Sequence, residues 1–82
     1  MTNSEKNQAD TRTAYNSHQT DIARLIDVLQ MELAKHAEAA SATCNWGHVG
    51  DLGGIRSNLI DTVSAISGAS REELETFLND AE

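Results

Sequence analysis

Four side chains that can bind metal ions lie in and beside a glycine-rich stretch of the chain: His36, Cys44, His48 and Asp51. Thiolate, imidazole and carboxylate groups are the ordinary protein ligands of zinc. Cys44 and His48 form one closely spaced pair, whereas structural zinc sites combine two such pairs. We therefore expect no metal and no cofactor. Cys44 would then be a small buried side chain, and His48 a solvated residue or a helix cap.

The sequence gives weaker support for phosphate binding or nucleophilic catalysis at this stretch. Glycine recurs as Gly47, Gly50, Gly53 and Gly54, and a glycine-rich helix N-terminus can bind phosphate. However, Asp51 places a negative charge there, no lysine follows, and no strand precedes the glycines to complete a phosphate-binding loop. No basic cluster adjoins Cys44 to activate it as a nucleophile. We expect no enzyme.

Trp46, the only tryptophan, begins this stretch. Tryptophan is enriched at the energetically dominant positions of protein interfaces. Trp46 is interpreted either as a core residue that covers the end of a small helical bundle or, together with His48, as a contact for a partner protein.

The whole chain is small and acidic, with 82 residues and a formal net charge of −7. A chain of this length forms one domain with a modest core. A lone cysteine cannot form an internal disulfide, so self-association remains as a source of stability. The negative charge opposes nonspecific binding to nucleic acid or to anionic membranes. Without a membrane-length apolar run or a hydrophobic signal region, we expect a cytoplasmic protein.

The first helix is predicted over residues 21–42, with a possible start at Thr11. Residues 1–12 are polar and have zero net charge, which predicts a disordered tail before a single helical domain over 13–82. An apolar stripe at helical spacing carries the prediction: Ile22, Ile26, Leu29, Leu33, Ala37 and Ala40. Acidic and basic residues alternate three apart on the polar face, a distance that allows ion pairs: Asp21, Arg24, Asp27, Glu32, Lys35 and Glu38.

Glycines weaken helices, so we expect a corner at residues 47–50, followed by a second helix over 51–67 capped by Asp51. Its apolar stripe is Leu52, Ile55, Leu59, Val63 and Ile66. The two stripes suit an antiparallel hairpin. Met31, Val28 and Ile60 lie outside this seam, and these remaining apolar residues predict a homodimer.

A third helix is predicted over residues 71–79. Gly68 suits the end of the second helix, and Ser70 with Glu73 forms a capping box. Leu74, Phe77 and Leu78 are expected to face the core.

The segment 63–77 resembles the generic helix-turn-helix pattern, with a small residue, Gly68 at the turn, Ser70 at the cap, and apolar residues four and seven further on. The resemblance implies that the third helix enters the major groove of DNA. Glu72, Glu73 and Glu75 against Arg71 make that electrostatically unfavourable. The opposite hypothesis is an acidic mimic that occupies the basic groove of a nucleic-acid-binding protein.

Together these patterns predict an all-α fold: an antiparallel helical hairpin with a short third helix, dimerising into a bundle. The predicted function is a protein–protein interaction or regulatory module that self-associates or docks an apolar helix face on an unknown partner protein. The alternatives are the nucleic-acid mimic and, less favoured, a DNA-binding helix-turn-helix protein. The candidate partner-binding residues are Trp46, His48, Met31, Ile60, Glu72, Glu73 and Glu75.

Overall fold

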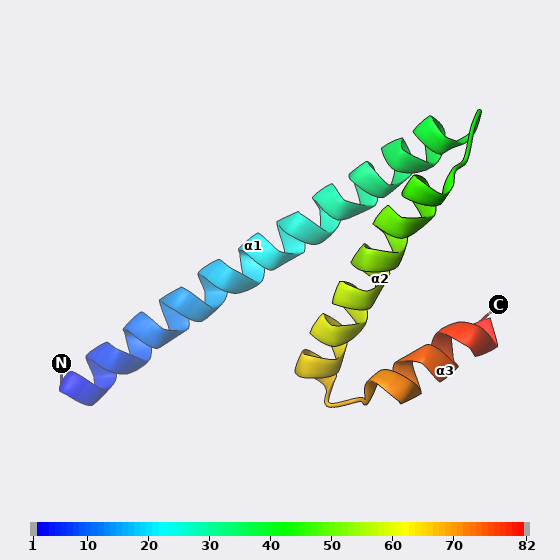
Figure 1. Ribbon diagram of the computed structural model, residues 1–82. Coiled ribbons are helices and arrows are strands. Elements are labelled where there is room, and N and C mark those ends of the chain that lie inside the picture. The colour runs from blue at the N-terminus through cyan, green and yellow to red at the C-terminus, as the bar shows by residue number, and fades with distance from the viewer. Residues whose placement is uncertain (1, 82) are drawn as a thin grey trace. The chain divides into compact units, whose positions relative to one another are not determined.

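The computed structural model describes residues 2–81, which form three helices and no strand. They are α1 (Asn3–Ala40), α2 (Trp46–Ser67) and α3 (Arg71–Ala81) (Figure 1). The all-helical prediction is therefore confirmed. The chain divides into two compact units, Met1–Ala39 and Ala40–Glu82.

Helix α1 begins much earlier than the sequence analysis placed it, because a capping box closes its first turn. The Glu5 backbone N–H donates to Thr2 Oγ1 at 3.2 Å, and the Thr2 N–H donates to Glu5 Oε2 at 3.0 Å. These bonds satisfy backbone donors that a helix start leaves open. Residues 3–12 are thus helical rather than irregular here. The domain boundary at residue 13 stays a prediction.

Helix α2 corrects the expected corner, because it runs through the glycine-rich residues instead of starting after them. Its N-cap is Asn45, not Asp51: the His48 N–H donates to Asn45 Oδ1 at 3.0 Å, and the Asn45 N–H donates to His48 Nδ1 at 3.3 Å. This reciprocal cap, followed by the Val49 N–H to Asn45 C=O bond of 3.2 Å, forms a first turn that the glycine content disfavours.

Three of the four glycines within α2 have open space at the position of a side chain. A Cβ atom built on Gly50, Gly53 or Gly54 would meet no atom within 4 Å. These residues lower the intrinsic stability of the N-terminal half of α2.

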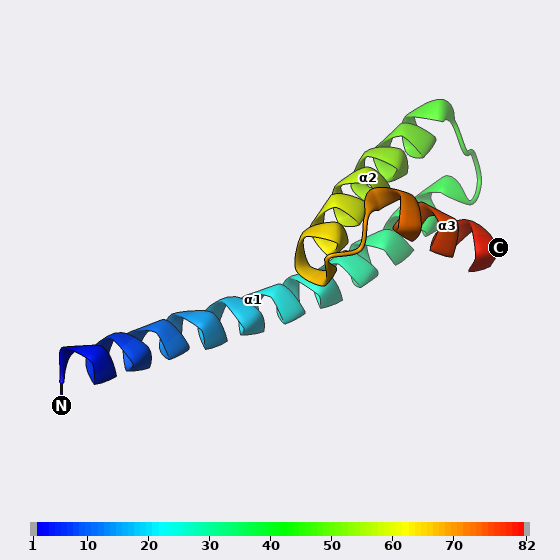
Figure 2. The same cartoon turned by 90° about the horizontal axis from the view of Figure 1, so that it is seen from below.

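The link between α2 and α3 follows the sequence prediction. Gly68 adopts a left-handed conformation (φ 79°), and its N–H donates to Ser64 C=O at 3.0 Å. Ser70 begins α3, because its Oγ accepts from the Glu73 N–H at 3.1 Å. Figures 1 and 2 both show the two helices meeting at this short link.

Candidate interaction surfaces

Arg71, the first residue of α3, binds two residues of α2 through its guanidinium group. Its Nη1 lies 2.7 Å from Asp61 Oδ1, and its Nη2 lies 2.9 Å from Ser57 Oγ. Nη1 also donates to the Ser57 C=O at 3.4 Å, and Nε lies 3.6 Å from Glu75 Oε1. The sequence analysis considered Arg71 only as a residue facing a DNA groove. Its partners lie ten and fourteen positions earlier in α2, a relation that local spacing does not reveal.

Ile60 is the one buried side chain among the residues described, with 4% of its surface exposed. The sequence analysis instead placed Ile60 among the apolar residues outside the hairpin seam that would be free to bind a second copy. Ile60 lies three residues from Ser57 and four from Ser64, and so shares the helix face on which Arg71 of α3 binds. Leu74 and Leu78 of α3 are half-buried, as expected, whereas Phe77 is 68% exposed and does not face a core.

The acidic residues of α3 do not form one uninterrupted row. Glu72 and Glu73 are exposed, and Glu73 accepts a hydrogen bond from Ser70 Oγ at 3.2 Å. Glu75 is half-buried between two arginines, 3.6 Å from Arg71 Nε and 4.0 Å from Arg56 Nη1. Two of the three predicted partner-binding glutamates, Glu73 and Glu75, therefore already have partners within the chain.

Trp46 occupies the first position of α2 and is 85% exposed. The interpretation of Trp46 as a core residue is not what the single chain shows. With Cys44, Asn45 and Val49 it lines a shallow hollow of about 220 Å³. Cys44 is exposed rather than buried, and His48 is half-buried and takes the capping role that the sequence analysis considered.

Metal-binding side chains do not gather in the described part of the chain. Within residues 2–81, no group of three or more histidine, cysteine, aspartate or glutamate side chains is placed to hold one ion.

The apolar stripe of α1 remains largely in contact with water. Leu29 and Ala40 of this stripe are half-buried, and Ile22, Ile26 and Leu33 are exposed. At the edge of the stripe, His36 is half-buried and Leu25 is exposed. Met31, on the opposite side of the helix, is 59% exposed, and Val28 is exposed as well.

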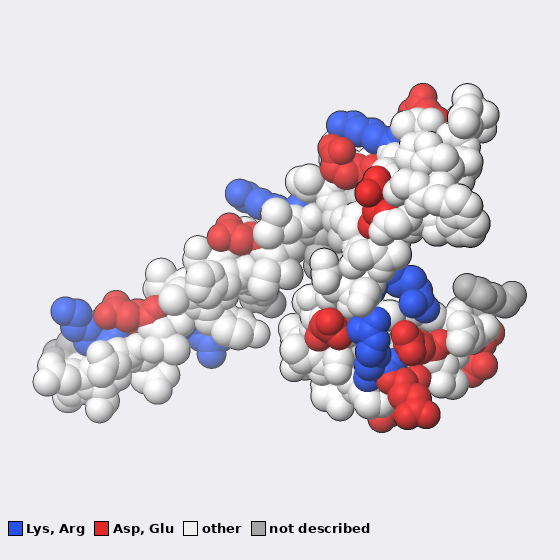
Figure 3. Space-filling model, in the orientation of Figure 1, with Lys and Arg blue, Asp and Glu red and all other residues white. Residues whose placement is uncertain are grey.

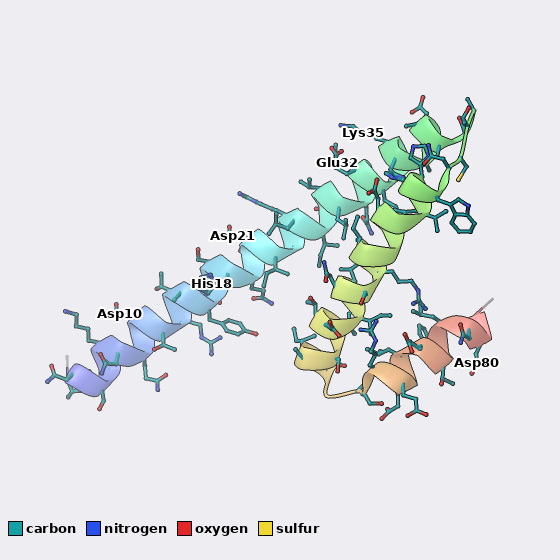
Figure 4. The ribbon with its side chains drawn as sticks, in the orientation of Figure 1. Asp10, His18, Asp21, Glu32, Lys35 and Asp80 are labelled. Carbon is teal, nitrogen blue, oxygen red and sulfur yellow. The ribbon has the colours of Figure 1, made fainter. Side chains whose placement is uncertain are left out.

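The polar face of α1 carries both signs of charge (Figure 3). Lys35 Nζ lies 3.1 Å from Glu32 Oε1, one of the ion pairs that the alternating pattern predicts (Figure 4). A mixed face of this kind is ordinary for a solvated helix surface.

The second apolar stripe, on α2, is exposed at all five positions. Its members are Leu52, Ile55, Leu59, Val63 and Ile66, of which Ile66 is the most exposed at 85%. This stripe lies on a different face of α2 from Ile60, so α3 does not cover it.

Comparisons with protein-family models, with curated proteins and with solved structures find no match to this chain. Among the described residues, no helix combines the length and the apolar character needed to cross a membrane.

Proposed function

We propose that this protein is a protein–protein interaction module that works by self-association, in which a second copy of the chain covers the apolar stripes of α1 and α2. The observation that carries the proposal is the extent of apolar exposure. Two helices present large apolar side chains at regular helical spacing, while Ile60 is the one buried side chain of residues 2–81.

The magnitude of this exposure favours a partner. Covering an exposed leucine or isoleucine is worth about 1.5–3 kcal/mol, and roughly half of that where the side chain is already partly covered. The eight exposed large apolar residues of the two stripes, together with Leu25 beside the α1 stripe, therefore represent on the order of 10 kcal/mol per chain before the entropic cost of association. Monomeric proteins rarely leave apolar surface of this extent uncovered.

The proposed assembly is a bundle of two antiparallel hairpins. The connection over residues 41–45 is short, and short connections join antiparallel neighbours in helical bundles. Helix α1 has 38 residues and α2 has 22, so α1 outreaches α2 in any such hairpin. The stripe of α1 continues toward its N-terminus through His18 and Tyr15, where a helix of a second copy can cover it.

The contact surface proposed here differs from the one that the sequence analysis predicted, which consisted of the apolar residues outside the hairpin seam: Met31, Val28 and Ile60. Ile60 is buried on the α2 face that binds α3. Of the three residues outside the seam, only Met31 and Val28 are therefore exposed. Two residues are a small surface, whereas the α1 and α2 stripes are each three or more helical turns long. We therefore propose the stripes as the interface, with Met31 as the competing site.

The nucleic-acid alternatives gain no support from the geometry. A mimic needs an uninterrupted acidic face, yet Glu75 is paired with Arg71 and Arg56. A groove-binding α3 needs an exposed basic residue, yet Arg71 is bound to Asp61 and Ser57. An unrelated protein that docks on the same stripes remains the competing partner to a second copy.

The test is the mass in solution across a concentration series, measured by light scattering after size-exclusion chromatography. Wild-type protein is expected at twice the chain mass of 8.9 kDa. Ile26→Glu places a charge in the α1 stripe and should give a monomer, because a buried unpaired carboxylate costs several kcal/mol.

Two matched variants decide where the interface lies. Ala34→Glu makes the same charge change on the polar face of α1 and should leave the dimer intact. Met31→Glu introduces the same negative charge on the side of α1 opposite the stripe, and it should also leave the dimer intact. A wild-type monomer at high concentration would refute self-association, and dissociation by Met31→Glu alone would move the interface to the opposite face.

A further inference from the structure

We propose that the N-terminal half of α1, residues 3–21, is helical only while a second copy of the chain covers it. Its folding is then coupled to association, and the helix seen over residues 3–21 is the conformation of the assembled state. This inference rests on the proposed self-association and adds a conformational change to it. The residue types, the local contacts and the length of α1 support it.

The two halves of α1 differ in how strongly their residues favour a helix. Polar residues with short side chains, histidine, β-branched residues and aromatic residues favour helices less than alanine, leucine and the long unbranched side chains. The C-terminal half, residues 22–40, contains five residues of this weaker class: Ile22, Ile26, Asp27, Val28 and His36. The N-terminal half is equally long and contains twelve: Asn3, Ser4, Asn7, Asp10, Thr11, Thr13, Tyr15, Asn16, Ser17, His18, Thr20 and Asp21. A segment of this composition depends on packing against a neighbour for its helical structure.

Contacts between successive turns give residues 3–21 little support. Thr13 Oγ1 donates to the Ala9 C=O at 2.9 Å, and the Arg12 guanidinium lies 5.5 Å from the centre of the Tyr15 ring. Both contacts join positions three or four apart, so they form only after the helix has formed, and a cation–π pair at an exposed site is weak. A single helix cannot cover its own apolar side chains, and Tyr15 is 57% exposed. Stabilising contacts must therefore come from another element.

The lengths of the helices show that the chain itself cannot supply these contacts. Helix α1 has 38 residues and α2 has 22. Laid alongside α1 from the connection over residues 41–45, α2 would end roughly 24 Å before the start of α1, at 1.5 Å per residue. Helix α3 does not extend this reach, because it turns back along α2 and places Glu75 Oε1 4.0 Å from Arg56 Nη1. Within residues 2–81, Tyr15 and the residues before it therefore lie beyond the reach of α2 and α3, and a second copy is the partner that covers them.

Association and the helical state of residues 3–21 then change together. In the assembled protein, covering Tyr15 removes a large aromatic side chain from water and stabilises the helix around it. In the monomer Tyr15 remains in water, and conformational entropy favours the unwound chain. Association therefore orders residues 3–21 in both copies, and dissociation releases them.

The first experiment compares the two states by NMR on the full chain. Helical content is measured residue by residue from Cα chemical shifts, in dimeric wild-type protein and in the monomeric Ile26→Glu variant. Residues 13–21 should be helical in the dimer and lose helical content at least about threefold in the variant, while residues 57–78 keep theirs because Arg71 binds α3 to α2. Ala34→Glu makes the same charge change on the polar face of α1 and should keep the wild-type shifts.

The second experiment needs no monomeric variant. Asn16→Ala combined with Ser17→Ala strengthens the helix at two exposed positions outside the apolar stripe. Because alanine lowers the cost of folding the segment in both copies, the Kd of the dimer should fall about tenfold. The matched pair is Asn58→Ala with Thr62→Ala, at exposed positions outside the apolar stripe of α2. This helix is formed in both states, so the pair should leave the Kd unchanged.

The outcomes distinguish this inference from the proposed self-association. A wild-type monomer at high concentration overturns both. If the wild type is a dimer, helical residues 13–21 in monomeric Ile26→Glu overturn the coupled folding alone. An unchanged Kd for Asn16→Ala with Ser17→Ala does the same. Equal tightening by the two alanine pairs also overturns it, because the whole chain rather than its N-terminal half would then fold on association.

Discussion

Arg71 connects α3 to two positions of α2 from one guanidinium group, with Asp61 and Ser57 as its partners. Such a bridge uses the planar fork of arginine, which can bind two acceptors at once, whereas lysine offers a single point charge. Ile60 supplies the apolar part of the same contact face. At the scale of single residues, the guanidinium group of Arg71 and the buried side chain of Ile60 thus stabilise the packing of α3 on α2.

Replacement of Arg71 is expected to loosen α3 selectively. Arg71→Ala should destabilise the corner by about 1–2 kcal/mol, because charged hydrogen bonds are lost but the side chain is partly solvated and screened. Arg71→Lys should recover less than half of this loss. The measurement is hydrogen-exchange protection of Leu74 compared with that of Leu59, and equal loss at both sites would contradict the role assigned to Arg71.

At the scale of secondary-structure elements, α2 combines two opposed tendencies. Its N-terminal half contains four glycines, yet Asn45 and His48 cap it and the helix forms. The sequence analysis weighted the glycines and overlooked the cap, because a histidine at the third helical position is not the usual capping partner. The Thr2–Glu5 box of α1 has the usual pattern and could have been recognised from the sequence.

Alanine at the open glycine positions should strengthen α2. Gly50→Ala and Gly53→Ala each have room for a Cβ, so each should raise the stability by about 0.5–1 kcal/mol. Gly68→Ala is the contrasting variant: its positive φ should make it destabilising by about 1 kcal/mol. Thermal unfolding followed by circular dichroism checks both signs. A decrease in stability for Gly50→Ala would show that a partner helix approaches α2 closely at that position.

At the scale of the whole molecule, the apolar stripes of α1 and α2 are exposed at most of their positions within residues 2–81. Residues 3–12 of α1 contain no large apolar side chain, whereas Tyr15 and His18 continue the stripe of α1. The proposed assembly therefore assigns different roles to these two parts of the N-terminal region.

Two truncations test this division. A chain that begins at residue 13 should keep the dimer mass and a melting temperature within about 2 °C of the wild type, because it removes no apolar contact. A chain that begins at residue 20 also loses Tyr15 and His18, and its melting temperature should fall by about 4–8 °C for each kcal/mol lost. A large effect of the first truncation would contradict residue 13 as the start of the domain.

Much of the fold is determined by local sequence signals. Apolar periodicity predicted three helices, and Gly68 and Ser70 marked the end of α2 and the start of α3 because left-handed backbone and hydroxyl capping are local properties. The candidate surfaces were predicted less well. The sequence analysis predicted that Phe77 and Cys44 are buried, and it considered a buried position as one of two alternatives for Trp46. All three side chains are exposed.

Tertiary structure alone decided which apolar residue is buried. Periodicity shows which side chains share a helix face but does not show which face receives a neighbour. Ile60 was therefore assigned to a spare surface, and the contacts of α3 through Arg71 placed it on the covered face instead. The sequence by itself determined where helices form, since that depends on neighbouring residues. Burial depends on contacts between residues far apart in the chain, so only the packing of α3 on α2 revealed which side chain is buried.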